Sequence, residues 1–452
     1  MDEELKIRKE KVLKFITNNK NVLIYLVLFL IIALGAFIRV QPFDKLIDST
    51  TGKYISIELD STVFLRYAEH IAENDVLYNI DKMRNYPVGV FIKDMGIFTS
   101  YFVAYTYRLF NLFIPNITVQ YVDILYPVLA TIIMTLYLFL FVRRVFNYKV
   151  ALLCCLFINL LPSFLFRSLG GSSDHDILVM MFMVMAFYFY TVALQSKKLR
   201  NNILFGAIAG FTTFLSMYSG GAAQFVLLVI GVATLLEILF NKLEDPHFYT
   251  YFSWLAVFSI FIQVINLKAG ILGHLNTLST MPAYLAFGVA LCHFFIIKRN
   301  LFNVNGYIKD KIPRGVTSVL LTFIFGSALF LILFGPNFFI DKFNQVISYV
   351  FHFYTSSRWA LTVAENRTPY VVDWIGQFSL LYFLFMLLGI VALFYDSTKS
   401  LKIRNKLTFL FGLFIFIYVF SRYSPNSVFN GGSTLSRITF YGSIILFFLI
   451  IV

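Results

Sequence analysis

Long apolar runs recur along almost the whole sequence, and they limit the folds that it can adopt. A helix needs about 20 residues to cross the hydrocarbon core of a membrane, and in lipid only helices and closed barrels satisfy their own backbone hydrogen bonds. Twelve runs approach this length: residues 21–40, 121–142, 150–166, 177–195, 203–218, 222–240, 250–266, 279–297, 316–334, 379–395, 407–421 and 437–452. They predict an all-α polytopic membrane protein with about twelve spans, folded as one transmembrane domain over residues 21–452.

Charge also favours a membrane fold over a soluble one. Asp, Glu, Lys and Arg make up 13% of the chain, whereas soluble proteins carry about 25%. The net charge of +13 would suit nucleic acid, but no basic face carries a recognition motif, and we expect no nucleic-acid partner. The three cysteines, Cys154, Cys155 and Cys292, lie in apolar runs, which predicts core residues rather than disulfides or a zinc site.

Basic residues predict the orientation of the spans. Six Lys and Arg side chains precede the first run, which places residues 1–20 in the cytoplasm, before an uncleaved signal-anchor. Later basic clusters also fall inside if residues 41–120 form one large outer loop, with the shorter apolar piece 97–115 as an interfacial helix. Arg108 in the middle of that piece agrees with this choice. The second and fifth outer loops are then residues 167–176 and 335–378.

Two carboxylates and an imidazole gather in loop 167–176, in the sequence Gly170-Gly-Ser-Ser-Asp174-His175-Asp176. Ionisable groups at the rim of a span are functional candidates. The paired glycines would permit a tight turn with free backbone N–H groups. Asp174 could instead cap the helix that follows, but a cap accounts for only one of the three side chains.

Two further acids are predicted on the same face: Asp60 in the first outer loop and Glu365 in the fifth. A lone acid in a polar loop is most often solvated, but converging carboxylates repel one another unless a cation joins them. Oxygen ligands suit Mg²⁺ or Mn²⁺, and His175 would shift the preference toward Mn²⁺ or another transition-metal ion. We therefore predict a metal site formed by Asp60, Asp174, Asp176 and Glu365, with His175 as a further candidate ligand.

Two other polar segments lie at the predicted outer ends of spans. Tyr218-Ser-Gly-Gly221 lies between two runs, where a glycine pair most often only permits a tight turn. Arg437 begins the last run, where arginine is frequently a snorkelling anchor. On the outer side, against the usual charge bias, Arg437 is a better candidate for binding an anionic ligand such as a phosphate.

Taken in order, these segments resemble the catalytic subunit of oligosaccharyltransferase, especially the archaeal single-subunit kind. The resemblance extends over essentially the whole chain, and its motifs are Glu58-Leu-Asp60 with Asp81-Lys-Met-Arg84-Asn-Tyr-Pro87, Gly171-Ser-Ser-Asp174-His-Asp176, Tyr218-Ser-Gly-Gly, Thr362-Val-Ala-Glu365 and Arg437-Ile-Thr-Phe-Tyr441. Val363 stands where the family's T-I-x-E motif has Ile. The resemblance implies a GT-C type glycosyltransferase membrane domain, for which the family has thirteen spans rather than twelve.

The resemblance also implies an activity: inverting, metal-dependent transfer of a glycan from a polyprenyl (dolichol-type) phosphate or pyrophosphate to Asn of an N-x-S/T sequon in a protein. Asp60 and Glu365 would hydrogen-bond the acceptor amide, and the four acids would hold Mn²⁺ or Mg²⁺. Arg437, with Tyr218 as a weaker candidate, would bind the phosphate of the lipid-linked donor. The site would face the extracytoplasmic side of a cell membrane.

The family's soluble C-terminal domain, which reads the sequon with a W-W-D-Y-G motif, has no counterpart in this sequence. The tryptophans are Trp254, Trp359 and Trp374, and the last apolar run stops at Val452 without a polar exit. We therefore expect a C-terminal part of the natural protein to lie beyond this sequence.

Two other functions fit the composition. Another polyprenyl-sugar-dependent GT-C enzyme, such as an O-mannosyltransferase, would be favoured by an Asp-Glu pair early in the first outer loop, whereas the Thr362–Glu365 motif favours the first interpretation. A cation-coupled transporter would place its acids near midspan in broken helices, whereas here the acids lie at one rim.

Overall fold

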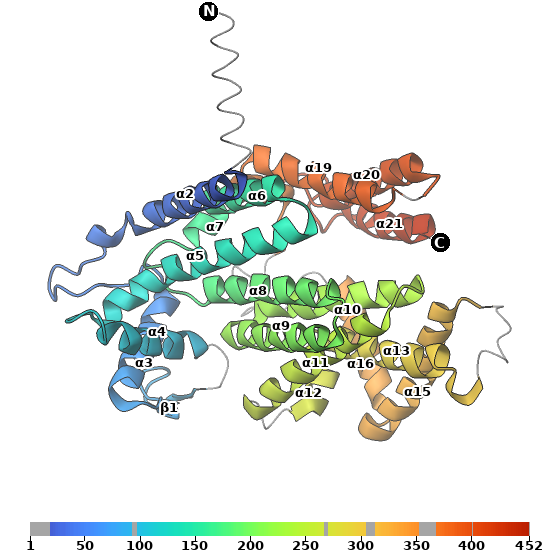
Figure 1. The fold of residues 1–452 in the computed structure, drawn as a ribbon, viewed down its shortest axis with the longest axis horizontal. Coiled ribbons are helices and arrows are strands. Elements are labelled where there is room, and N and C mark those ends of the chain that lie inside the picture. Colours follow the sequence, from blue (N-terminus) through green and yellow to red (C-terminus); the bar gives the residue numbers. More distant parts are fainter. Residues whose placement is uncertain are drawn as a thin grey trace, which may run out of the picture. The chain divides into compact units, whose positions relative to one another are not determined.

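Helices make up most of the chain in the computed structural model (Figure 1), which describes residues 19–92, 97–265, 270–303, 312–351, 368–399 and 401–451. The chain divides into two compact units. The first comprises residues 1–160 and 164–333, and the second comprises residues 161–163 and 334–452.

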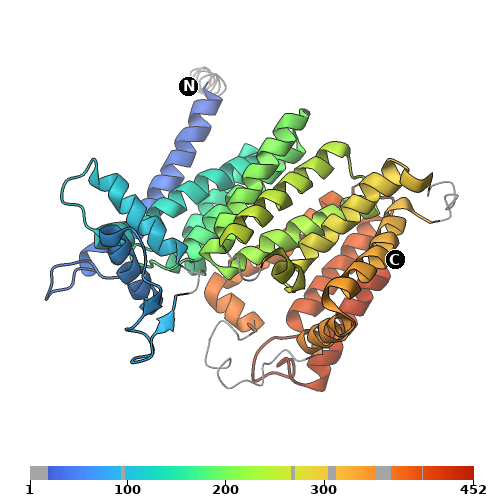
Figure 2. The same ribbon diagram turned by 90° about the horizontal axis from the view of Figure 1, so that it is seen from below.

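The first unit holds most of the long apolar helices: α2 (Lys20–Val40), α5 (Val119–Val145), α6 (Tyr148–Leu160), α8 (Asp176–Leu194), α9 (Leu199–Ser219), α10 (Gln224–Leu239), α11 (Asp245–Ile265), α13 (Met281–Leu291), which continues as the π-helix η3 (Cys292–Lys298), and α15 (Arg314–Phe334). Helices α8, α9 and α11 lie side by side in both views (Figures 1 and 2). Trp254 of α11 is fully buried in this packing and donates its indole N–H to Thr213 Oγ1 at 3.0 Å.

Shorter elements occupy the connections: η1 (Phe43–Lys45), α3 (Leu59–Asn74), β1 (Ile80–Asp81), β2 (Val90–Phe91), α4 (Phe98–Asn111), α7 (Pro162–Phe166), η2 (Gly221–Ala223), α12 (Gly270–Asn276) and η4 (Leu301–Asn303). Strands β1 and β2 pair antiparallel. Helices α3 and α4 pack on α5 and α8 through one apolar cluster that includes Tyr67, Ile71, Val103, Tyr126 and Met181. This cluster fixes the helix that begins beside Asp60 to the helix that begins at Asp176.

The second unit contains α16 (Asn337–Phe351), α18 (Val371–Phe378), α19 (Leu380–Ser397), α20 (Arg404–Phe420) and α21 (Thr434–Ile451). Helices α19, α20 and α21 pack together, shown in orange to red in Figure 1. Aromatic rings from all three helices meet: the Phe411 ring centroid lies 4.0 Å from that of Phe394 and 6.3 Å from that of Phe447.

The predicted all-α polytopic membrane fold is confirmed. Within the described residues, nine helices are long and apolar enough to cross a membrane, and the three other predicted runs lie on α6, α20 and α21. The run 150–166 differs from the prediction, because α6 ends at Leu160 and α7 begins at Pro162. Proline cannot donate to the preceding turn, and it drives the residue before it away from helical backbone angles.

The apolar piece 97–115 forms α4, whose 14 residues extend over only about 21 Å at 1.5 Å per residue. Its place at the interface, outside the spans, stays a prediction. Arg108 has a specific role there: its Nη2 donates to the carbonyls of Ile71 and Ala72, both at 3.1 Å, and its Nη1 lies 2.5 Å from Asp75 Oδ1. Arg108 therefore satisfies the C-terminal carbonyls of α3, where a cation is favoured by the helix dipole.

Candidate active site

The loop before α8, residues 167–176, is held by the helices beside it. Gly170 donates its N–H to Arg39 O in α2 at 2.9 Å, and Gly171 donates to Ile124 O in α5 at 3.0 Å. Gly171 has a φ of +88°, and an added Cβ would lie 2.4 Å from a neighbouring leucine side chain, so only glycine fits this turn. The expectation that the paired glycines have free N–H groups is wrong, because both donate to backbone carbonyls.

Asp174 is held through its backbone and through its side chain. Tyr126 of α5 donates its hydroxyl to Asp174 O at 2.6 Å, and the Asp174 carboxyl accepts from the His175 backbone N–H at 2.7 Å. The His175 ring lies beside the same carboxyl, with Nδ1 2.6 Å from Oδ1. Helix α8 begins at Asp176 with His175 at its N-cap, and no side chain caps it. The helix-cap explanation of Asp174 is therefore wrong.

Asp174 and His175 stabilise each other's charged form. Burial alone would raise the pKa of the Asp174 carboxyl, but the hydrogen bonds and charge of His175, together with the charge of Arg167, hold that pKa below its ordinary value. The hydrogen bond to Asp174 raises the pKa of the His175 imidazole, against the opposing effect of burial, and the charges of Asp176 and Asp60 add to the rise. Asp60 therefore lies within electrostatic reach of loop 167–176.

Arg167 lies among three carboxylates. Its Nη1 is 3.3 Å from Glu58 Oε2, 3.8 Å from Asp174 Oδ2 and 3.7 Å from Asp176 Oδ2. Glu58 also accepts a hydrogen bond from Ser172 Oγ, so the first and second loops meet here. Sequence reasoning assigned no role to Arg167 or Glu58. The available signal was weak, since Glu58 is one of nine acids between residues 41 and 120.

Asp60 lies in the first turn of α3 with an exposed side chain. Further along, α3 is tied to the β1–β2 hairpin by Asp81, which is 1% exposed, accepts from Tyr67 Oη at 2.8 Å and pairs with Arg66. Burial would raise the pKa of Asp81, but hydrogen bonds from Tyr67 and the Met83 backbone N–H, with the Arg66 charge, lower it below the ordinary value. The helix that carries Asp60 is therefore fixed within its loop.

Gly220 brings the end of α9 against His175. An added Cβ at Gly220 would lie 2.4 Å from His175 Cδ2 and 3.0 Å from Nε2, so the glycine backbone directly covers the imidazole. Tyr218, two residues earlier, packs its ring against Phe98 and Phe214, with centroid separations of 5.4 and 5.7 Å. Tyr218 thus belongs to the turn that touches His175, and phosphate binding by Tyr218 stays a prediction.

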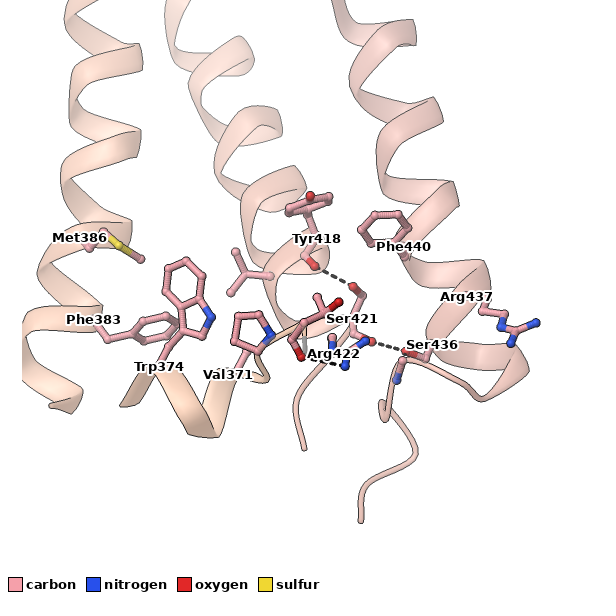
Figure 3. A pocket seen from close by; sticks show the side chains of 14 residues that line it. Val371, Trp374, Phe383, Met386, Tyr418, Ser421, Arg422, Ser436, Arg437 and Phe440 are labelled. Atoms are coloured by element: carbon pink, nitrogen blue, oxygen red, sulfur yellow. Dashed lines mark hydrogen bonds between the residues drawn. The ribbon is translucent and has the colours of Figure 1, made fainter. Parts of the chain in front are cut away.

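In the second unit, Arg437 lines a cavity of about 270 Å³ (Figure 3). Figure 3 shows Arg437 extending from α21 away from Trp374, whereas Arg422 lies in the middle of the view. Arg422 Nη2 donates to Thr368 O at 2.8 Å, and its guanidinium lies 4.3 Å from the Tyr370 ring centroid. Sequence reasoning missed Arg422, although it is the first basic residue of the predicted outer segment after α20. Phosphate binding by Arg437 stays a prediction.

The predicted metal site is only partly covered by the structure, because Glu365 lies outside the described residues. Among the residues that are described, no group of three or more His, Cys, Asp or Glu side chains is placed to hold a metal ion. The donor types still fit a hard divalent cation, since Asp174 and Asp176 direct carboxylate oxygens toward one positive group, Arg167.

Known proteins share both sequence and fold with this chain. The family model described as "Oligosaccharyl transferase STT3, N-terminal" matches residues 23–452. Among curated proteins, dolichyl-phosphooligosaccharide-protein glycotransferase 2 of Archaeoglobus fulgidus is 27% identical over 165 residues, which are 36% of this chain and 26% of that protein.

Three solved structures of the Archaeoglobus fulgidus oligosaccharyltransferase have a similar fold. AglB in complex with an inhibitory peptide and a dolichol-phosphate matches with a TM-score of 0.65 at 16% identity, over 96% of this chain and 50% of that one. The enzyme tethered to an acceptor peptide with the NVT sequon gives 0.60 at 17%, over 95% and 50%. The complex with Zn and sulfate gives 0.56 at 17%, over 92% and 52%. The chain spans about half the length of these solved relatives.

Proposed function

The chain belongs to the oligosaccharyl transferase STT3 family, and we propose that it forms the catalytic membrane domain of an oligosaccharyltransferase. It would transfer a glycan from a dolichol-type polyprenyl phosphate or pyrophosphate to Asn of an N-x-S/T sequon, with inversion at the sugar. The dolichol-phosphate and the NVT-sequon peptide bound by its fold relatives support this donor and acceptor. The observation that carries the proposal is the gathering of Asp174, Asp176 and Glu58 around Arg167, with Asp60 in electrostatic reach.

The chemical difficulty is the acceptor, because a carboxamide nitrogen has its lone pair delocalised into the carbonyl. Asp60 and Glu365 would each accept a hydrogen bond from the acceptor NH₂ group and withdraw the nitrogen from conjugation. The Asn nitrogen then bonds to the sugar C1 as the bond from C1 to the carrier phosphate breaks, and one amide proton leaves to a carboxylate. The exposure of Asp60 at the start of α3 supports this role, since an acceptor peptide must reach it.

Asp60, Asp174, Asp176 and Glu365 would hold a divalent metal ion, with His175 as a further candidate ligand. Such an ion supplies positive charge beside the leaving phosphate. Oxygen ligands of this kind suit Mn²⁺ or Mg²⁺, and the relative solved with Zn supports a divalent metal in general.

Arg437 would bind the donor phosphate through charge-assisted hydrogen bonds, and Tyr218 would add its hydroxyl. The apolar side chains that line the cavity beside Arg437, among them Trp374 and Phe383, support contact with a lipid-linked donor. We place the N-terminus in the cytoplasm and the site on the extracytoplasmic face of a cell membrane. The positive charge of the predicted inner loops supports this orientation.

The test replaces Asp60 and Glu365 by alanine, one at a time, in the protein expressed from its complete gene. Each variant is assayed with a labelled N-x-T peptide, lipid-linked donor and Mn²⁺. We expect transfer to fall by about 10²-fold or more, the usual effect of removing one group that stabilises developing charge. The matched control is Asp44→Ala, since Asp44 is an exposed acid of the same loop, and its rate should stay near wild type. Glycosylation retained in Asp60→Ala and Glu365→Ala would contradict the assignment.

A further inference from the structure

Asp123 is a fully buried acid in the second turn of α5, and the reaction described above does not use it. Its chain neighbours Val122 and Ile124 are also fully buried. An ionisable side chain inside a span is costly to desolvate, so such residues are functional candidates by default.

Asp123 joins the two loops that carry Asp60 and Asp174. Its Oδ2 accepts a hydrogen bond from Ser56 Oγ at 2.7 Å, and its backbone carbonyl accepts one from Ser173 Oγ at 2.8 Å. Ser56 lies four residues before Asp60, and Ser173 directly precedes Asp174. One residue of α5 thus contacts both loops close to the acids that they present.

Ile124 and Tyr126 of the same helix also bind the second loop, but neither makes a hydrogen bond to Ser56. Ile124 O accepts from Gly171 N at 3.0 Å, and Tyr126 donates its hydroxyl to Asp174 O at 2.6 Å. Asp123 Oδ1 accepts no hydrogen bond from the described part of the chain. The buried carboxyl therefore interacts with two hydroxyl groups, Ser56 by the hydrogen bond to Oδ2 and Ser173 beside it, and an apolar side chain of the same size would lose both interactions.

We propose that Asp123 is a positioning residue that sets the separation between Asp60 and the Asp174–Asp176 pair through its hydrogen bond to Ser56. The inference rests on the proposed function, because this separation matters only if the acids act on one ion or substrate. Ligands of such a site must be held within about 0.5 Å of the working geometry. A hydrogen bond just outside the ligands is the usual means, and its loss typically lowers metal affinity about 10- to 100-fold.

The test measures Mn²⁺ binding by electron paramagnetic resonance, with neither donor nor peptide present. Ser56 is only part-exposed and its hydroxyl is small, so Ser56→Ala removes the bond with little other change. We expect Ser56→Ala to weaken Mn²⁺ binding about 10-fold and Ser56→Thr, which keeps the hydroxyl, to stay within about twofold. Asp123→Val should weaken binding at least as much as Ser56→Ala does, and the double variant should be no worse than Asp123→Val alone, since both substitutions remove the bond between Ser56 and Asp123.

The matched control is Thr213→Val, which removes the buried hydrogen bond to Trp254 in the same unit but outside both loops. It should lower the melting temperature and leave Mn²⁺ affinity unchanged. Ser56→Ala that binds Mn²⁺ as tightly as wild type, or Ser56→Thr that binds as weakly as Ser56→Ala, would overturn the proposal.

If the wild-type protein binds no Mn²⁺, the metal assignment is wrong. The positioning role is then tested by amide hydrogen exchange. Ile57 donates its N–H to Gly171 O across the two loops at 2.8 Å. Under the proposal, Ser56→Ala speeds exchange of the Ile57 and Gly171 amides more than Thr213→Val does. Equal exchange in the two variants would overturn it.

Discussion

Gly220→Ala should damage the site specifically, because nothing but a hydrogen atom fits between this residue and His175. The backbone at Gly220 is extended, with φ −175° and ψ 164°, so alanine adopts it without strain. The obstacle is space: the new Cβ would lie 2.4 Å from His175 Cδ2 and 3.0 Å from Val179 Cγ2. The neighbouring Gly221 is the matched control, since its Cβ would meet only Gln224 Nε2 at 3.8 Å.

The size of the effect follows from these distances. Ordinary contact begins at 3.4 Å, so the imidazole must move by about 3.4 − 2.4 = 1.0 Å. Overpacking of this kind typically destabilises by about 1–3 kcal/mol, and a misplacement of about 1 Å can reduce catalysis about 10²-fold. The ring cannot move alone, because its Nδ1 lies 2.6 Å from Asp174 Oδ1.

The assay compares initial rates of glycan transfer and melting temperatures for Gly220→Ala and Gly221→Ala, with saturating donor and metal. We expect about a 10- to 100-fold loss of rate for Gly220→Ala and a rate near wild type for Gly221→Ala. In a His175→Ala background the clash with the imidazole is gone and only the 3.0 Å contact with Val179 Cγ2 remains, so Gly220→Ala should add little further loss. Equal rates for the two glycine variants, or additive losses in the double variant, would refute the reasoning.

Two further predictions concern stability. Because the folded-state pKa of Asp81 is lowered, its ionised contacts stabilise the fold above the ordinary aspartate pKa of about 3.9, and that stability is lost as the pH falls through the lower, folded-state value. The melting temperature should therefore fall between about pH 5 and pH 3 more steeply in wild type than in Asp81→Asn, and parallel curves would contradict this. Arg39 is fully buried and donates to Ser168 Oγ at 2.9 Å and to Asn159 Oδ1 at 3.3 Å. Arg39→Met should therefore lower the free energy of unfolding by about 2 kcal/mol, and Arg39→Lys should lower it less. Denaturant unfolding in detergent measures both. Unchanged stability in Arg39→Met would show that these bonds contribute nothing.

The membrane architecture was predictable because its signal is long and local. The predicted apolar runs lie on helices, with the run 150–166 divided between α6 and α7, since about 20 apolar residues in sequence have few alternatives to a span. The helix break at Leu161 also follows from Pro162, but the apolar length of residues 150–166 predicted one continuous span. The side of the membrane and the number of spans stay predictions.

Residues of the candidate site were predicted from the sequence only where they belong to a recognisable motif. Asp174 and Asp176 both direct a carboxylate oxygen toward Arg167, and their role as metal ligands stays a prediction. The helix-cap alternative for Asp174 failed because its carboxyl bonds to the very next backbone N–H. Arg39 and Asp123 were missed, although each is a charged residue at the edge of an apolar run, which is itself a signal. Ser56 lies 67 residues from Asp123, and Ser168 lies 129 residues from Arg39, and no local pattern predicts such pairings.

Transfer to asparagine is the central claim, and mass spectrometry of the product tests it most directly. The protein expressed from its complete gene is incubated with lipid-linked donor, Mn²⁺ and either an N-V-T peptide or the matching Q-V-T peptide. We predict a glycan on the Asn nitrogen of the first peptide, none on the second, and loss of the product in Asp174→Ala. A glycan on the Thr hydroxyl, or equal product from both peptides, would contradict the claim.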